Sequence, residues 1–530
     1  MVSAENIINT ILDRTNCSKV FTYPGTPPAK LYKEVERSSA ELVQGVREQH
    51  LTHLAQTRYY KKLEQGNEEI PVIIVSGEMG EAMMMQGLLA GSITSPCLVI
   101  VAESRFEHVD NSINIAHQTD RGSTHDKLDN SDVLRRHENV HHRVLLQDGD
   151  DLDDVETMIQ ELKEKKEVGI VHVPIYSHDS SEGGYLSEPE KIDQSRLQNR
   201  WNEAEKPMIV AGRGAKDPKV RDMIENLSKS SGAPLAVSIP MEGYFEDNYV
   251  GRIGMMGTPS ANQAFKEADL VLSIGTSMQN VITSFGENNI QEFREKTVQV
   301  EPNPRRRSFF VGSYIEGSAG EVLSELNSEK EEWLSSNDYG LEDKRKFIPE
   351  PVNALGQLIR EDFSDKVVTL GVGNSVIWLP YSLGPEIRKE TSRSGSMGEV
   401  VAGLNREENP ILVLGDGELE MDLSLIVEAQ YRTESAALFI INNQRLGLVT
   451  EIQEKQFDEK ITPKDNSVNF QDLGESFKGV ESFSAEKAEE VDEKARKAIN
   501  SDKISLVEIK VEEDLHSELF DVNALPDLDN

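Results

Sequence analysis

The sequence predicts an α/β fold of three doubly wound domains, each built on a parallel sheet. Short apolar runs alternate with amphipathic helical stretches three times along the chain, which is the pattern of βα units. The 530 residues are enough for three to four domains of roughly 150 residues each. A polar stretch rich in Ser, Gly and Pro at 177–191 reads as a linker. We therefore place the domains at 1–180, 190–330 and 350–515.

The predicted strands are the buried apolar runs of each block. In the first block they are KVFTYPG, AELVQGV, PVIIVSG, PCLVIVAES and VGIVHVPIY, and the segment REQHLTHLAQTRYYKKL reads as a helix. In the second block they are KPMIVAGRG, APLAVSI, ADLVLSIGTS and KTVQVEPNP, followed by a charged helical stretch at 316–348. The third block contributes KVVTLGVGNS, PILVLGDG, AALFIINN and SLVEIKV. The acidic segment HSELFDVNALPDLDN after it is expected to be a surface tail or a mobile flap.

The charge balance argues against nucleic acid and anionic membranes as partners. The chain carries 93 Asp and Glu against 56 Lys and Arg, a formal charge of −37 spread along its length. Such a surface is typical of a halophile's salt-rich cytoplasm, and an ordinary acidic enzyme is the alternative. No apolar run reaches the ~18 residues needed to span a bilayer, and no signal peptide is visible, so we expect a cytoplasmic protein. Only Cys17 and Cys97 are present, which excludes a disulfide framework.

Two oxygen-bearing side chains follow neighbouring strands of the third block. Asp416 comes directly after ILVLG, and Asn443 follows ALFIIN. Ligands of parallel α/β sheets bind at the carboxyl ends of the strands. A carboxylate and an amide oxygen suit Mg²⁺, and Gly415 and Gly417 allow a diphosphate to approach the backbone. The alternative is that these residues only form turns between strands and helices.

The spacing of GDG and NN, with residues 418–441 between them, resembles that of thiamine diphosphate enzymes similar to acetolactate synthase. The resemblance implies a pyrimidine-binding, a central and a diphosphate-binding domain, in that order. It implies Mg²⁺ ligation by the side chains of Asp416 and Asn443 and by the carbonyl of Arg445. The cofactor contacts implied around these ligands are Gly415, Asp416, Gly417, Glu418, Asn443, Arg445, Leu446, Gly447 and Leu448.

Other segments resemble the family in the same order. The stretch GVGNSVIW at 371–378 is similar to the family's strand end beside the diphosphate, which implies contacts from Val372, Gly373, Asn374 and Ser375. The segment SGSMG at 394–398 is similar to Gly-Thr-Met-Gly, which implies that Gly395 lines the site and that Met397 wedges the cofactor into its bent form. A core methionine is the alternative for Met397.

The resemblance also supplies an acid from the N-terminal domain. YPGTPPAKLY is similar to the family's Tyr-Pro-Gly-Gly strand end, which places Pro24 and Gly25 beside the cofactor. About two dozen residues later, Glu48 and Gln49 match the family's Glu-Gln at the start of a helix. Glu48 is then the catalytic acid that exchanges a proton with the aminopyrimidine, and a partly desolvated carboxylate has the raised pKa that this exchange requires. A solvated glutamate at a helix N-terminus is the alternative.

The resemblance implies a carboligase that decarboxylates a 2-oxo acid and transfers the fragment to a second oxo acid. A simple 2-oxo-acid decarboxylase and a non-catalytic binding relative are the alternatives. Because metal site and glutamate lie on different subunits in this family, a homodimer or a dimer of dimers is expected.

The substrate side departs from the family pattern. SGEMGEAMMM stands where Ser-Gly-Pro-Gly is usual and places Glu78 near the pyrimidine, while Met83–Met85 read as helix core. IAHQTDRGSTHDK aligns Gln118 as a second catalytic group and Lys127 as a possible one, with His117 in place of an aromatic residue. The loop GTSMQNVITSFG lacks the arginine expected for FAD, so FAD is possible but not expected. RRHENVHH has the H-E-x-x-H spacing of zinc proteases but runs into a β-like segment, so we interpret it as a connection.

Overall fold

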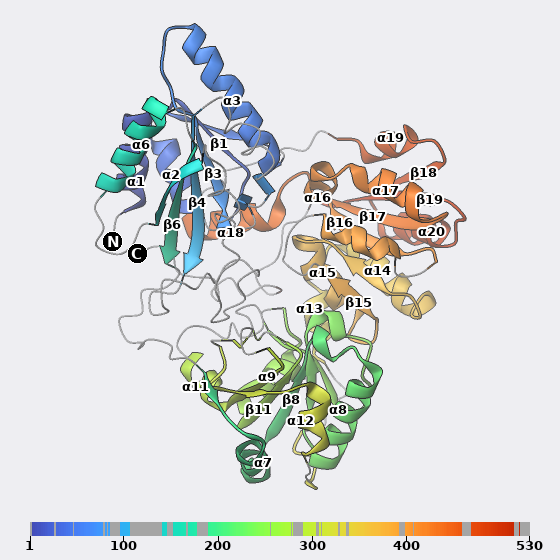
Figure 1. Ribbon diagram of the computed structural model, residues 1–530. Coiled ribbons are helices and arrows are strands. Elements are labelled where there is room, and N and C mark those ends of the chain that lie inside the picture. The colour runs from blue at the N-terminus through green and yellow to red at the C-terminus, as the bar shows by residue number, and fades with distance from the viewer. Residues whose placement is uncertain are drawn as a thin grey trace.

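The computed structural model confirms the predicted fold class: three lobes, each built on one parallel sheet with helices packed against it (Figure 1). None of the helices in the part of the chain that it describes is both long and apolar enough to cross a bilayer. The structure describes residues 3–25, 28–45, 47–77, 80–81, 83–84, 96–105, 140–145, 152–165, 168–176, 189–254, 256–276, 278, 290–303, 307–308, 310–326, 329–334, 339–391, 398–405, 408–457, 468–512 and 519.

The N-terminal sheet has the strand order β2-β1-β3-β4-β6-β5. Its central strands are almost wholly apolar, as expected for a sheet covered on both faces. The strands are β1 (Lys19–Thr22), β2 (Glu41–Gln44), β3 (Val72–Ser76), β4 (Cys97–Arg105), β5 (Val140–Leu145) and β6 (Val168–Tyr176). The helices are α1 (Ala4–Thr15), α2 (Ala29–Arg37), α3 (Glu48–Glu64) and α6 (Asp153–Lys165).

The central sheet has the order β10-β9-β8-β11-β12-β13-β7. Three of its strands were not predicted, because β7, β10 and β13 are only two to four residues long. The strands are β7 (Glu190–Lys191), β8 (Pro207–Ala211), β9 (Leu235–Val237), β10 (Tyr249–Arg252), β11 (Leu270–Ile274), β12 (Thr297–Glu301) and β13 (Ser313–Glu316). The helices are α7 (Gln194–Glu203), η1 (Arg213–Ala215), α8 (Pro218–Ser231), η2 (Ile239–Met241), α9 (Pro259–Glu267), α11 (Ile290–Lys296) and α12 (Ala319–Ser324).

The charged stretch 316–348 is not the helix that we predicted. Where the structure describes it, it is helical only in α12 and in α13 (Leu341–Arg345). The intervening part binds the central domain through main-chain acceptors: the indole of Trp333 donates to the carbonyl of Pro207 (2.8 Å), and Lys330 Nζ donates to that of Trp201 (2.9 Å). These tertiary contacts override the helical propensity of the charged residues.

The C-terminal sheet has the order β15-β14-β16-β17-β19-β18. The strands are β14 (Val368–Leu370), β15 (Lys389–Thr391), β16 (Ile411–Gly415), β17 (Ala436–Asn442), β18 (Val480–Ala485) and β19 (Ile504–Lys510). The helices are α14 (Glu350–Asp362), α15 (Asn374–Leu383), η5 (Glu399–Asn405), α16 (Asp416–Met421), α17 (Ser424–Arg432), α18 (Gly447–Phe457), α19 (Phe470–Glu475) and α20 (Ala488–Ile499). Because β14, β16 and β17 are adjacent and parallel, their carboxyl ends lie side by side.

A buried charge cluster joins the central and C-terminal domains. Glu242, Arg252 and Lys389 are all fully buried. Glu242 pairs with Arg252 Nη1 at 3.0 Å and with Lys389 Nζ at 3.1 Å, and the Arg252 guanidinium lies 4.2 Å from the Tyr381 ring centroid. Burial lowers the pKa of Lys389 to about 8, and Glu242 opposes this shift. One carboxylate therefore compensates two buried cations that come from different domains.

Glu242→Ala is expected to destabilise the protein by about 3–5 kcal/mol, because removing one partner leaves buried charge uncompensated. Urea unfolding monitored by circular dichroism measures the effect. The matched control is Glu246→Ala, four residues further along and exposed, which should shift the midpoint very little. Equal midpoints for the two variants would contradict the importance of the cluster.

Candidate active site

Three strand ends of the C-terminal sheet gather the predicted metal and diphosphate residues. Asp416 opens α16 directly after β16, and Asn443 follows the last residue of β17. Gly415 pairs in register with Ile441, so the two positions lie at the same edge of the sheet. Both side chains are almost completely buried, Asp416 at 3% and Asn443 at 9% exposure. The structure thus brings together these two residues from separate βα units.

The two asparagines of the NN pair have different roles. Asn442 donates from Nδ2 to Glu508 Oε1 (2.6 Å) and accepts from the backbone N–H of Gln444 (3.0 Å), so it supports the turn. Asn443 Nδ2 is buried without a hydrogen-bond partner among the residues that the structure describes, and so are both polar atoms of the Asn374 side chain. A Cβ added at Gly447 would lie 2.5 Å from Nδ2 of each of these two amides. Two unsatisfied amides therefore face the same point at the start of α18.

These residues fit a magnesium-bound diphosphate. Buried amides without partners are costly unless a ligand satisfies them. A Cβ at Gly373 or Gly415 would meet no heavy atom within 4 Å, so the backbone there borders open space. Gly373 also has φ 78°, a conformation that favours glycine. Asp416 and Asn443 would supply a carboxylate and an amide oxygen to Mg²⁺, with remaining positions for phosphate oxygens and water.

Hydrogen bonds to side chains of the same domain hold the turn that follows β14. Ser375 donates its hydroxyl to the carbonyl of Val372 (3.0 Å), so this hydroxyl stabilises the first turn of α15. The backbone N–H of Val372 donates to Glu418 Oε2 (3.0 Å). Gly417 lies against Leu446, where a Cβ would be 2.5 Å from the side chain. Glu418 therefore contacts a segment more than forty residues away in sequence.

Glu48 is at the start of α3, as the sequence predicts. Its Oε2 atom is buried and has no hydrogen-bond partner within the described ranges. Burial raises the pKa of Glu48 to about 7, against the opposing effects of its own backbone N–H and of Arg47. Arg47 Nε is likewise buried and unpartnered. Glu48 is therefore a carboxyl group that can exchange a proton near neutrality, and the guanidinium of Arg47 lies beside it.

Tyr23 lies between the N-terminal and C-terminal domains. Burial is the main cause of its raised pKa, and Glu48, Glu418 and Asp416 add to the shift by their charge. In the surrounding apolar cluster, Phe21, Tyr23 and Leu51 of the N-terminal domain pack with Met421 and Leu446 of the C-terminal domain. Figure 1 shows α18 beneath the N-terminal sheet. Within one chain, the predicted acid Glu48 and the predicted metal ligand Asp416 thus both lie near Tyr23. Tyr23 opens the YPGTPPAKLY segment, but the sequence alone did not indicate a role for it.

Other predicted residues have contacts within the chain, and their roles toward the cofactor stay predictions. Pro24 is buried, and a Cβ at Gly25 would collide with Ser76 at 2.6 Å, so Gly25 packs against β3. Arg445 Nη2 donates to the carbonyl of Glu512 (3.4 Å), and Leu448 packs on the core of the C-terminal domain. Gln118, Gly395 and Met397 lie outside the described residues, as do Glu78, His117 and Lys127.

The zinc-protease spacing is not on a helix. Val140–Leu145 forms β5, so His141 occupies a strand. In the parts of the chain that the structure describes, no group of three or more His, Cys, Asp or Glu side chains could hold a metal ion. Of the predicted helix methionines, Met84 is buried in the core and Met83 packs against it.

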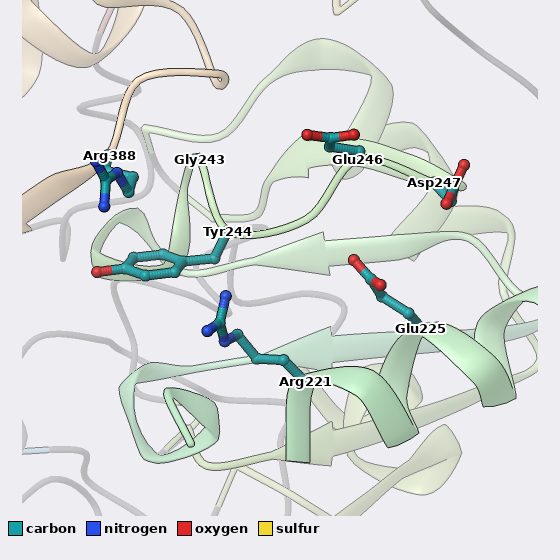
Figure 2. A pocket seen from close by; sticks show the side chains of 7 residues that line it. All are labelled: Arg221, Glu225, Gly243, Tyr244, Glu246, Asp247 and Arg388. Atoms are coloured by element: carbon teal, nitrogen blue, oxygen red, sulfur yellow. The ribbon is translucent and has the colours of Figure 1, made fainter. Parts of the chain in front are cut away.

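A separate cavity of about 470 Å³ lies between the central and C-terminal domains (Figure 2). None of the predicted site residues lines it. In Figure 2 the Arg221 side chain points toward Tyr244, and its guanidinium lies 5.1 Å from the ring centroid. The residues lining the cavity are Arg221, Glu225, Gly243, Tyr244, Glu246, Asp247 and Arg388.

The AGRG turn is also explained by domain contacts. A Cβ at Gly212 or Gly214 would meet the backbone of Gly275 within 2.8 Å, so both glycines serve packing between the ends of β8 and β11. Arg213 Nη2 donates to the carbonyl of Thr391 in the C-terminal domain (2.7 Å).

Comparison with known proteins finds three matching family models. They are the N-terminal TPP binding domain (2–133), the central domain (195–326) and the C-terminal TPP binding domain (391–509) of the thiamine pyrophosphate enzymes. Protein YdaP of Bacillus subtilis, whose name describes it as thiamine pyrophosphate-containing, is 24% identical over 64% of this chain and 62% of its own length. The acetolactate synthase large subunit of Cyanidium caldarium is 26% identical over 54% and 53%. The isozyme 2 large subunit of Escherichia coli is 23% identical over 61% and 62%. The matches thus span less than two thirds of each relative.

Proposed function

Because this chain belongs to the thiamine pyrophosphate enzymes, we propose that it decarboxylates a 2-oxo acid and transfers the remaining fragment to a second oxo acid. Similarity to acetolactate synthase large subunits supports this choice. The observation that carries it is the buried Oε2 atom of Glu48, which has no hydrogen-bond partner among the described residues and lies, like Asp416, near enough to Tyr23 to raise its pKa.

The residues of the site would then bind the cofactor and exchange protons with it. Asp416 and Asn443 would hold Mg²⁺ and, through it, the diphosphate, while the Asn374 amide would donate to a phosphate oxygen. When bound, thiamine diphosphate supplies an electron sink for the electron pair that stays on the substrate fragment when carbon dioxide leaves. Glu48 Oε2 exchanges a proton with the pyrimidine ring, which its raised pKa permits near neutrality.

The environment of Arg47 favours a substrate that carries a carboxylate. Its Nε is buried without an acceptor among the residues described, directly before Glu48. A guanidinium in this position suits the carboxylate of a 2-oxo acid by charge-assisted hydrogen bonding. A simple decarboxylase would use the same residues, and it differs only in that a proton, not a second carbonyl, captures the fragment.

A screen of 2-oxo acids tests the proposal. The full chain is loaded with thiamine diphosphate and Mg²⁺ in high salt and supplied with 2-oxo acids singly and in pairs. We expect carbon dioxide release together with a condensed 2-hydroxy-3-oxo acid. An aldehyde as the sole product would establish the simple decarboxylase, and no carbon dioxide release from any acid would refute both reactions.

We propose further that the chain works as a homodimer in which the contact between the N-terminal and C-terminal domains, seen here within one chain, is exchanged between subunits, so that Glu48 of one subunit completes the metal site of the other. Large apolar side chains are exposed on the two helices that flank the site. They are Leu54 and Leu63 on α3, and Val427 and Tyr431 on α17, with Tyr431 at 84% exposure. Their burial between subunits would supply apolar contact area, which supports an interface on these helices.

Mixing two inactive variants tests the shared site. Glu48→Gln and Asp416→Asn are each expected to be inactive alone. After co-expression, random pairing should restore about a quarter of wild-type activity, because half of the dimers are mixed and each holds one intact site. A preparation mixed only after folding, without subunit exchange, is the control. No recovery in co-expressed dimers would show that each site is completed within one chain.

A further inference from the structure

Glu418 bridges two segments of the diphosphate edge. It lies on α16 two residues after Asp416 and is 3% exposed. Its Oε2 accepts the backbone N–H of Val372 (3.0 Å), and its Oε1 accepts that of Gly398 (3.1 Å). The carboxylate therefore ties the turn after β14 to the segment that enters η5.

The carboxylate leaves no space for another side chain beside it. A Cβ at Gly371 would lie 1.9 Å from Glu418 Oε2 and 2.8 Å from its carboxyl carbon. Gly398 has φ 84°, which presents its N–H in a backbone conformation that favours glycine. Converging main-chain N–H groups of this kind form an anion site, and phosphate oxygens use the same donors. In this chain a glutamate occupies those donors.

Electrostatics makes this arrangement unusual for a diphosphate site. Asp416 and Glu418 are both nearly fully buried, and a diphosphate would add further negative charge. Mg²⁺ would neutralise Asp416 by direct ligation, whereas Glu418 accepts the backbone N–H groups of Val372 and Gly398, which carry no net charge. Like charges close together in a weakly polar interior repel strongly.

We propose that Glu418 is an internal anion that occupies the backbone amides of Val372 and Gly398 and competes with the cofactor's diphosphate for them. This inference rests on the assignment of thiamine diphosphate as cofactor. The bridge holds the turn after β14 together with Gly398, and it lowers the affinity for the cofactor. Displacement of the carboxylate would free both amides for phosphate oxygens.

Calorimetric titration of the apo chain with thiamine diphosphate at saturating Mg²⁺ tests the proposal. Glu418→Ser should bind at least tenfold more tightly than wild type, and Glu418→Gln should lie between them. Both apo variants should melt at a lower temperature than wild type, because two partly buried N–H groups lose a charged acceptor. The cofactor should therefore raise their melting temperature by a larger increment.

Two controls show whether the change in affinity depends on Glu418 and on the diphosphate. Glu428→Gln removes an exposed carboxylate paired with Arg432 on the neighbouring helix, and it should bind like wild type. Thiamine without phosphate should bind wild type and Glu418→Ser equally. If wild type binds the cofactor but Glu418→Ser binds it no better, the inference is wrong and the cofactor assignment stands. If wild type binds no thiamine diphosphate, the assignment itself fails.

Discussion

Glu48→Gln is expected to lower kcat by about 10² to 10⁴-fold, because glutamine cannot exchange a proton with the pyrimidine ring. The amide keeps the size of the side chain, so cofactor binding measured by calorimetry should change little. The conservative variant Glu48→Asp, whose carboxyl is one carbon shorter, should retain partial activity. Gln49→Glu in the Glu48→Gln background should not restore it, since the next helical position points elsewhere. Unchanged turnover in Glu48→Gln would refute the assigned role.

The raised pKa of Glu48 has consequences for both activity and stability. If the neutral carboxyl donates the proton, kcat/KM should fall as pH rises through about 7, with an inflection that Glu48→Gln lacks. Since the folded pKa lies above the unfolded value of 4.5, Glu48 favours folding below pH 4.5, and this contribution is lost as pH rises to about 7. At pH 8, Glu48→Gln should therefore be more stable than wild type by about 1–3 kcal/mol. Equal stability at pH 8 would show that the carboxyl is well solvated.

Asp416→Asn is expected to abolish activity at ordinary cofactor concentrations. Loss of the charged magnesium ligand should weaken binding of thiamine diphosphate with Mg²⁺ by about 100-fold or more. This is a larger loss than is usual when a residue that only supports a metal ligand is removed. Calorimetric titration measures this loss of affinity.

Asp492→Asn is the matched control for Asp416→Asn. Asp492 lies half-exposed on α20 and pairs with Arg496 (3.0 Å). It should leave cofactor affinity unchanged. Near-wild-type affinity in Asp416→Asn would place the metal elsewhere.

The fold was predictable where strands are long and apolar. Runs such as VIIVS and ALFII are recognisable because both faces of a parallel sheet are covered. The edge strands β7 (EK) and β15 (KET) were not predicted, because they are short and contain no apolar residue, unlike the short strands β9 (LAV) and β14 (VTL). The helix expected at 316–348 failed for a different reason: Trp333 and Lys330 bind main-chain carbonyls of the central domain. Contacts of that kind depend on tertiary structure, which local sequence does not encode.

The site was predictable at its cofactor motifs and less so in its details. Motif spacing placed Glu48, Asp416 and Asn443 correctly on helix starts and strand ends. It could not show that Asn442 supports a turn while Asn443 remains unsatisfied, since this depends on Glu508 across the sheet. Nor could it show that Glu418 reaches Val372 and Gly398. Such partners are separated by twenty to forty-six residues and meet only after folding.

The close approach of Gly371 to Glu418 is also a constraint on how this lineage can vary. Any side chain at 371 would overlap the carboxylate, so the two positions should change together among relatives. A relative with serine or alanine at 418 can accept a larger residue at 371, whereas in one that retains glutamate the carboxylate would have to leave its two amides. An alignment of close relatives would then separate those that inherited the internal anion from those whose cofactor amides are free.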